Sequence, residues 1–144
     1  MRLLVPLDLS SATERVLATA TTVARDTSAS VWLLHVAEPD PAFVGYDAGS
    51  AAVRDQVAQE YREEHRQLQD HARQLREAGI EATPLLVRGP TADTILDRAT
   101  HLAVDLIVMA THGRGAMFDI LVGSISHAVL RRSTIPVLMV PTRS

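Results

Sequence analysis

The sequence of 144 residues contains no cysteine and no lysine, and each absence excludes a class of function. Without cysteine there is no disulfide, no thiolate nucleophile and no cysteine-ligated zinc. All 14 basic residues are arginine. A Walker-type phosphate loop needs a lysine after its last glycine, and Schiff-base catalysis needs a lysine amine, so both of these enzyme classes are excluded.

Long apolar segments and an excess of positive charge are also missing. No apolar run approaches the roughly 20 residues that a membrane-spanning helix needs. The formal net charge is −3 at pH 7, whereas a nucleic-acid-binding surface normally carries a basic stripe. The apolar start of the chain is too short, and too soon followed by Asp8, to form a secretory signal peptide. We therefore expect a cytoplasmic protein that neither inserts into membranes nor binds nucleic acid.

The common motifs of hydrolases and metalloenzymes are missing as well. No serine lies in a Gly-x-Ser-x-Gly elbow, and no His-Glu-x-x-His sequence occurs. No two of the six histidines form a close pair at a recognised ligand spacing, and only His112 lies in a glycine-rich loop. The six are His35, His65, His71, His101, His112 and His127. We expect no catalytic side chain and no metal ligand among them.

What the sequence does contain is a regular alternation of strand and helix patterns. Short apolar segments predict strands over residues 2–7, 30–36, 80–87, 106–109 and 135–140. Helical spacing of apolar residues predicts helices after residue 11, over residues 51–78, after residue 90 and over residues 124–132. This alternation is typical of an α/β fold with a parallel sheet and helices on both faces. The length fits one domain, residues 1–144.

Local signals mark the ends of several elements. Ser11 and Glu14 form a capping-box pattern with Ser11 as N-cap, and Pro90 suits the first position of a helix. Gly79 is typical of the residue that follows a helix C-terminus. Residues 39–49 contain two prolines and two glycines, and they form a connection long enough to be a lid or an insertion.

The segment with the clearest functional pattern lies near the C-terminus. The apolar strand 106–109 leads into a loop over residues 110–116, which contains Gly113 and Gly115, and a helix restarts at Gly123-Ser124. A strand, a glycine-bearing loop and a helix N-terminus together hold phosphate groups, because free backbone N–H groups point at the anion. The alternative is that the glycines serve a turn and a helix cap. The buried strand and the length of the loop favour a nucleotide site.

Asp8 follows the first strand and supplies a second candidate group. Its carboxylate accepts hydrogen bonds from a ribose hydroxyl if the first and fourth strands are neighbours. The alternative is that Asp8 caps the first helix, as Asp and Ser commonly do. Taken alone the two interpretations are even, and the glycine-bearing loop favours the ligand.

Several segments resemble the universal stress protein family over essentially the whole chain. They are Leu4-Val5-Pro6-Leu7-Asp8, Leu34-His35-Val36, Val104-Asp105-Leu106-Ile107-Val108-Met109 and Ile135-Pro136-Val137-Leu138-Met139-Val140. The ATP-binding branch of that family carries Gly-x2-Gly-x9-Gly-Ser/Thr. This chain has Ala110-x2-Gly113-x9-Gly123-Ser124, which keeps three of the four elements at the correct spacing. Alanine in place of the first glycine is harmful only if that backbone needs a positive φ.

The resemblance implies strand order 3-2-1-4-5 and an ATP site with Mg²⁺ or Mn²⁺ bridging the phosphates. Asp8 would bind the ribose, Val36 and Met109 would contact adenine largely through backbone, and the helix start at Gly123 would hold phosphates. The candidate residues are Pro6, Leu7, Asp8, Val36, Met109, Ala110, Gly113, Arg114, Gly123, Ser124 and Ile125. No general base is evident for attack on a γ-phosphate, so we expect a stress-response or regulatory module with at most slow ATP hydrolysis.

The last strand predicts how the protein assembles. Pro136 disfavours a central position in a sheet, and an apolar edge needs a covering partner. In the resembling family two such edges meet across a two-fold axis. We therefore expect a homodimer joined through residues 135–140, with the two strands antiparallel.

Two other functions stay open at this stage. One is a dimeric interaction module whose nucleotide site has decayed at Ala110. Tight nucleotide binding by the purified protein would exclude this function. The other is an adenylyl-transferring enzyme of related architecture. The absence of lysine and of a His-x-Gly-His motif after the first strand counts against the enzyme.

Overall fold

The computed structural model describes residues 1–38, 51–112 and 122–142, in which strands and helices alternate. The lid or insertion expected over residues 39–49 lies outside the described residues. The strands are β1 (Arg2–Pro6), β2 (Ser30–Ala37), β3 (Ala82–Arg88), β4 (Leu106–Ala110) and β5 (Val137–Val140). The helices are α1 (Thr13–Thr27), α2 (Ala51–Glu77), α3 (Thr91–His101) and α4 (Ser124–Arg132).

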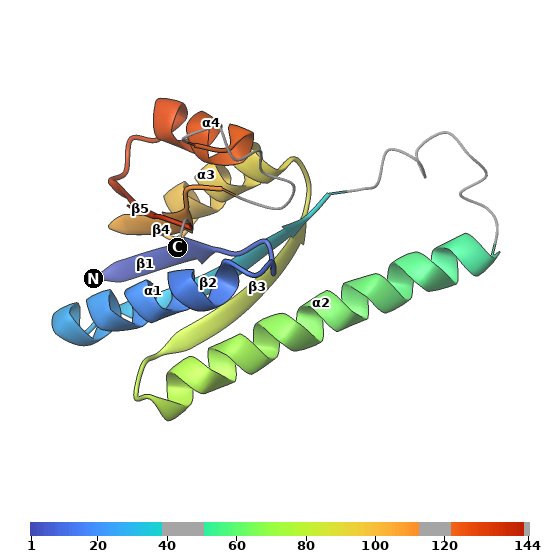
Figure 1. Ribbon diagram of the computed structural model, residues 1–144, viewed down its shortest axis with the longest axis horizontal. Helices are drawn as coiled ribbons and strands as arrows, with labels where there is room; N and C mark the ends of the chain where they lie inside the picture. Colours follow the sequence, from blue (N-terminus) through green and yellow to red (C-terminus); the bar gives the residue numbers. More distant parts are fainter. Residues whose placement is uncertain (39–50, 113–121, 143–144) are drawn as a thin grey trace.

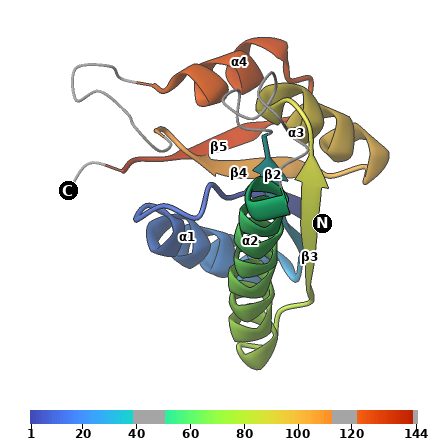
Figure 2. The ribbon, with the colours of Figure 1, turned by 90° about the vertical axis from the view of Figure 1, so that its right-hand side faces the viewer.

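The strands form one parallel sheet of five in the order β3-β2-β1-β4-β5, which confirms the expected topology. Helices α1 and α2 cover one face of the sheet, and α3 and α4 cover the other (Figures 1 and 2). The central strand β1 is apolar on both faces because helices cover both sides: Leu3, Leu4 and Val5 have no exposed surface.

Alternation along the strands divides the core into two layers. Leu3, Val5 and Leu33 pack with the buried residues of α1 and α2. Leu4 and Ile107 point to the other side and pack with Ile95 and Val129 from α3 and α4. This period of two places neighbouring residues of one strand in different layers.

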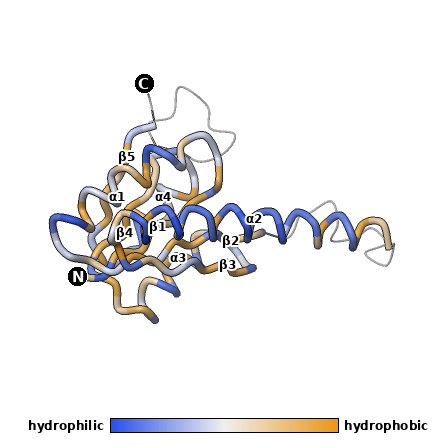
Figure 3. The backbone as a smooth tube through the Cα atoms, turned by 90° about the horizontal axis from the view of Figure 1, so that it is seen from below, coloured by the Kyte–Doolittle hydropathy of each residue, from blue (hydrophilic) through white to orange (hydrophobic). Residues whose placement is uncertain are grey.

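Helix α2 extends well beyond the sheet at its N-terminal end (Figure 1). Its buried residues, Leu68, Ala72 and Leu75, belong to its C-terminal half. Much of the tube is hydrophilic along the projecting part (Figure 3). The helix ends as expected before Gly79, whose φ of 84° is a conformation that glycine adopts without strain.

Three local expectations are wrong. The N-cap of α1 is Ala12 and not Ser11, and no side chain of the described residues caps it. The hydroxyl of Ser10 accepts a hydrogen bond from the Ala12 N–H at 3.3 Å, which closes a turn before the helix. Pro90 is the N-cap of α3 and not its first helical residue, because its ψ of 131° is extended.

The third wrong expectation concerns the start of the last strand. Strand β5 begins at Val137, so Pro136 lies before it and not inside it. The Pro136 carbonyl accepts a hydrogen bond from the Ile107 N–H at 3.0 Å, a contact that needs no proline N–H. The edge position of β5 therefore follows from the strand order and not from a proline within the strand.

Candidate functional site

The sheet opens between β1 and β4 at the ends of these strands. Their last paired residues are Leu4 and Ile107, although β1 continues to Pro6 and β4 to Ala110. Strand order also reverses between these two strands, since β2 and β3 lie on one side and β5 on the other. Parallel α/β sheets bind ligands at such a switch point, beyond the carboxyl ends of the strands.

Asp8 lies at this opening, two residues after the end of β1, and one of its two carboxylate oxygens has no partner among the described residues. Its Oδ1 accepts a hydrogen bond from the Ser10 N–H at 3.0 Å. Its Oδ2 is buried and has no hydrogen-bond partner among the described residues, and the same holds for Oγ1 of Thr13 at the start of α1. Buried oxygens without partners are costly, so these two atoms mark a place where a ligand can supply the missing contacts.

The chain between these groups turns sharply. Leu9 has a φ of 61°, a left-handed conformation that is strained for a leucine. Sequence reasoning did not predict this turn. The capping role that competed for Asp8 is not observed in its expected form, because the carboxylate binds the Ser10 N–H in the turn before the helix.

The N-terminus of α4 supplies the second half of the candidate site. Gly123 is the N-cap, no described side chain caps this helix, and its first turn contains no acidic residue. The first N–H groups of a helix have no partner within the helix, and they carry partial positive charge. Ser124 is exposed as the first helical residue. This helix start is suited to an anion.

Two hydrogen bonds join the start of α4 to the end of β4. The Gly123 N–H donates to the Thr111 carbonyl at 2.7 Å. The buried hydroxyl of Ser126 donates to the Ala110 carbonyl at 2.8 Å. Sequence reasoning missed Ser126. Its only signal was a small polar residue on the helix side that the apolar pattern assigns to the core.

Ala110 is the position at which the chain departs from the four-element glycine pattern. It is the last residue of β4, is paired with Val140, and is absent from the residues with positive φ. Its backbone is therefore extended, a conformation that alanine adopts as readily as other residues. The substitution of alanine for glycine does not strain this strand end.

The remaining predicted residues fall into three groups. Leu7, Val36 and Met109 are buried, and the side chains of Val36 and Met109 pack in the core under α3 and α4. Only backbone atoms of those two residues are therefore left for a ligand. Pro6 is partly buried and Ile125 is exposed. Gly113 and Arg114 lie outside the described residues.

Two of the histidines contact the same region. His112 is buried, and its Nδ1 lies 3.1 Å from the hydroxyl of Thr111. His35 contacts the Leu7 carbonyl through Nδ1 at 2.7 Å and the Glu64 carboxylate through Nε2. Among the residues of the described ranges, no group of three or more histidine and acidic side chains is arranged to hold a metal.

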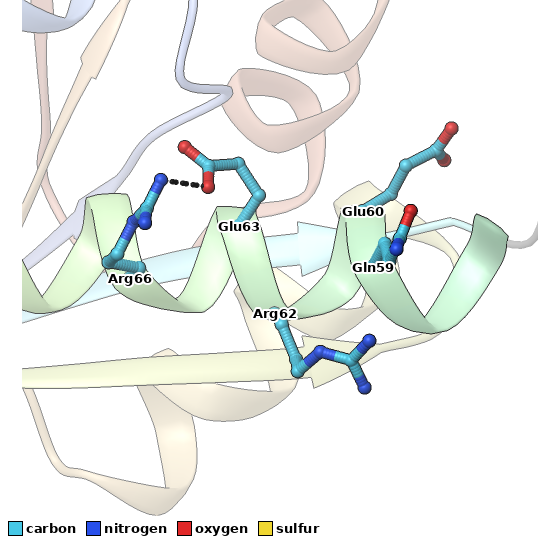
Figure 4. Close-up of a pocket in the computed structure, with 5 residues that line it drawn as sticks. All are labelled: Gln59, Glu60, Arg62, Glu63 and Arg66. Carbon is cyan, nitrogen blue, oxygen red and sulfur yellow. Dashed lines mark hydrogen bonds and ion pairs between the residues drawn. The ribbon is translucent and has the colours of Figure 1, made fainter. Parts of the chain in front are cut away.

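A surface hollow on α2 is a different kind of feature. It is lined by Gln59, Glu60, Arg62, Glu63 and Arg66, all from this one helix. Figure 4 shows Arg66 paired with Glu63 and Arg62 pointing to another side of the helix. The pairing lowers the pKa of the Glu63 carboxyl. Such exposed pairs are an ordinary solvated helix surface, and the hollow lies on the opposite face of the sheet from α4.

None of the helices in the described ranges is long and apolar enough to cross a membrane.

Sequence comparison relates nearly the whole chain to known proteins. A sequence model described as the universal stress protein family matches residues 1–141. A universal stress protein of Thermus aquaticus is 31% identical over 140 residues, covering 96% of both chains. The protein YxiE of Bacillus subtilis is 28% identical over 144 residues, covering 96% of this chain and 97% of the relative.

Solved structures have the same fold. The protein MJ0577 of Methanocaldococcus jannaschii superimposes with a TM-score of 0.84 at 24% identity, over 99% of this chain and 96% of its own. A universal stress protein in complex with cAMP has a TM-score of 0.69 at 22% identity, over 99% and 98%. One from Archaeoglobus fulgidus in complex with dAMP has a TM-score of 0.66 at 24% identity, over 97% of each chain.

Proposed function

The chain belongs to the universal stress protein family, and from this premise we propose that it binds ATP at the opening between β1 and β4. The observation that carries the proposal is the buried Oδ2 of Asp8, which has no partner among the described residues. It lies at the switch point of the sheet, where the strand ends also present the uncapped start of α4. The complexes of family members with cAMP and dAMP support an adenine nucleotide as the ligand.

Each part of the nucleotide has a candidate partner. Asp8 accepts a hydrogen bond from the ribose, and the backbone of Val36 and Met109 contacts adenine. The N–H groups at the start of α4 and the Ser124 hydroxyl bind phosphate oxygens. A divalent cation, Mg²⁺ or Mn²⁺, would accompany the nucleotide and neutralise charge on the phosphates. Gly113 and Arg114 complete the proposed phosphate loop.

We assign the protein a regulatory role in the stress response rather than efficient catalysis. No acidic or histidine side chain suggests itself in the sequence as a general base for attack on a γ-phosphate. ATP hydrolysis is therefore slow, and the bound nucleotide acts by occupying the site. The proposed location is the cytoplasm.

Titration calorimetry with ATP, ADP and AMP in the presence of Mg²⁺ tests this function. We expect a micromolar dissociation constant for ATP, which corresponds to a binding free energy on the order of −8 kcal/mol. The change Asp8→Ala should remove the preference for ATP over 2′-deoxy-ATP, because the ribose hydroxyl loses its acceptor.

The alternatives give different results in the same experiments. Absence of heat and of any thermal shift at millimolar ATP would favour the interaction module with a decayed site. Accumulation of an adenylylated product from labelled ATP would favour the adenylyl-transferring enzyme.

We also propose that the protein is a homodimer joined through residues 135–140. Among the described strands β5 pairs only with β4, and Val137, Leu138 and Met139 are partly buried, so the edge carries apolar residues that a second copy can cover. Sedimentation of the wild-type protein should give the dimer, and Met139→Lys should give the monomer. A wild-type monomer of about 16 kDa at micromolar concentration would overturn this proposal, since standard interfaces are stable there.

A further inference from the structure

His35 connects three elements through its two ring nitrogens. It lies in β2, and its alternation with Val31 and Leu33 places it on the sheet face that α1 and α2 cover. Nδ1 is 2.7 Å from the Leu7 carbonyl oxygen, directly after β1, and Nε2 contacts the Glu64 carboxylate on α2. The side chain of His35 is only 12% exposed. This contact therefore joins β1, β2 and α2 at a nearly buried point.

The partners fix where the protons are. A carbonyl oxygen only accepts hydrogen bonds, so Nδ1 must carry a proton and donate it to Leu7. On the other side of the ring, Nε2 contacts the Glu64 carboxylate. Glu64 thus holds the ring in the orientation in which Nδ1 faces Leu7. A carboxylate that orients a histidine through its second nitrogen is a familiar arrangement in functional sites.

The contact matters because it acts where the strand pairing of β1 has ended. The last residues paired between β1 and β2 are Pro6 and Leu34. One residue further, the Leu7 N–H donates to the Leu34 carbonyl at 2.8 Å, and the Leu7 carbonyl accepts from His35. Leu7 is only 5% exposed, and the imidazole is the hydrogen-bond partner that the described residues provide for its carbonyl. Both polar groups of Leu7 are therefore held by β2, immediately before Asp8.

We infer that His35 is a positioning residue for nucleotide binding, which acts by fixing the Leu7 carbonyl and hence the direction in which Asp8 leaves β1. Glu64 orients the ring, so the position of α2 and the occupancy of the site are coupled. The ligand opening lies at the strand ends and the α2 contact lies on the face of the sheet that α1 and α2 cover, and the Leu7 peptide joins them. This inference rests on the proposed ATP binding.

Three substitutions at His35 separate the two hydrogen bonds. In His35→Asn the amide nitrogen takes the place of Nδ1 and keeps the bond to Leu7. In His35→Gln the amide lies near the place of Nε2 and keeps only the contact with Glu64. His35→Leu keeps neither. We expect ATP affinity within about 3-fold of wild type for Asn and a loss of about 10-fold for Gln and Leu, which is the worth of one buried hydrogen bond.

Matched variants on α2 provide the controls. His65→Leu changes an exposed histidine next to Glu64 and should leave ATP affinity unchanged. Glu64→Ala should weaken ATP binding, whereas Glu63→Ala removes a carboxylate that pairs with Arg66 within the helix and should not. Thermal melting of every variant identifies any loss caused by unfolding. The ¹⁵N resonances of the His35 ring in the wild-type protein should shift on addition of ATP.

The results distinguish a failure of the proposed ATP binding from a failure of the role inferred for His35. If the wild-type protein does not bind ATP, the proposed function fails. If the wild-type protein binds ATP and the folded Leu or Gln variant binds within about 2-fold of it, the positioning role of His35 is wrong. Equal losses in the Asn and Gln variants would also overturn it, because they would show that the Leu7 bond is not the contact that matters. Should the Leu and Gln variants fail to fold, an unshifted His35 ¹⁵N resonance in wild-type protein with ATP would overturn the inference.

Discussion

Helices α3 and α4 both begin at the edge where the parallel strands end, but their N-termini differ. The start of α3 is closed by the protein itself. One oxygen of the Glu38 carboxylate, after β2, accepts hydrogen bonds from the Thr91 N–H at 2.9 Å and from the Thr91 hydroxyl at 2.7 Å. These bonds lower the pKa of the Glu38 carboxyl. A second acid, Asp93, lies in the first turn of α3.

The start of α4 has neither of these features. Its N-cap is a glycine, its first turn contains no acid, and no described side chain caps it. Arg131 and Arg132 occupy the last turn, where positive charge suits the helix dipole. The comparison teaches that, within the described ranges, the protein supplies negative charge to the start of α3 and none to the start of α4. The start of α4 comes after β4 in the chain, and β4 borders the opening between β1 and β4.

The largest effect should come from making α4 resemble α3. Gly123 has a φ of −67° and a ψ of 165°, so an aspartate can adopt its backbone conformation. In Gly123→Asp the carboxylate caps the helix and repels phosphate, and we expect ATP affinity to fall more than about 100-fold in calorimetry. In Gly123→Asn the side chain caps the helix without adding charge, so ATP affinity should fall less than in Gly123→Asp. Binding by the Asp variant within about 3-fold of wild type would show that phosphate does not lie at this helix start.

A smaller effect on ATP affinity is expected when the start of α4 loses one hydrogen-bond donor. Ser124→Ala should weaken ATP binding by about 1 kcal/mol, or roughly 5-fold, because one hydrogen bond to phosphate is lost. AMP binding should change less if the lost contact is to the outer phosphates. Ser133→Ala, beyond the far end of the same helix, is the control and should leave ATP affinity unchanged. Equal affinity of Ser124→Ala and wild type would remove Ser124 from the site.

Removal of the Glu38 carboxylate from the start of α3 should change the stability of the protein and not its ATP affinity. We expect Glu38→Ala to lower the free energy of unfolding by about 0.5–1 kcal/mol at pH 7, near the low end for a lost cap because Glu38 is exposed. The folded-state pKa of Glu38 is lowered from 4.5, so this stability is present above that value. It is lost as pH falls through the lower folded-state pKa.

Urea denaturation at pH 7 and below pH 4 measures the contribution of Glu38, and ATP affinity at pH 7 should stay within about 2-fold of wild type. A loss of ATP binding as large as that of Gly123→Asp would mean that the two helix starts do not have separate roles.

The smallest effect should come from restoring the glycine pattern at the end of β4. Ala110→Gly should change ATP affinity by less than about 5-fold, because the extended backbone at this position does not need glycine. The affinity is measured under the conditions used for wild type. A gain of about 100-fold would instead mean that alanine has impaired the natural site and would favour the interaction module.

Much of the fold could be predicted because its signals are local. The alternating apolar segments predicted every strand and helix of the described ranges, with ends displaced by a few residues. The glycine pattern and the apolar strand before it drew attention to the end of β4 and the start of α4, which the structure joins by two hydrogen bonds. Periodicity and glycine content are properties of short segments, and a sequence displays them directly.

Contacts between distant segments were the ones that the sequence did not reveal. The sequence predicted Ser11 as the cap of α1, but tight turns over residues 8–12 moved the helix start to Thr13. The cap of α3 comes from Glu38, 53 residues away along the chain, and the partner of His35 on α2 is 29 residues away. A carboxylate or an imidazole has the same local signature whether it contacts solvent, a helix start or another side chain.

The sequence by itself determined the alternation of elements, the helices on both faces of the sheet and the Gly-Ser start of α4, because each depends on residue type and spacing within one segment. Only the tertiary structure decided that the backbone at Ala110 is extended, that Glu38 closes α3 and that Oδ2 of Asp8 is buried without a described partner. Those outcomes depend on which backbone conformation and which neighbours the packed sheet imposes. Hydrogen bonds form between groups that folding brings within about 3 Å of each other, and the separation of two residues along the chain does not indicate whether they come that close.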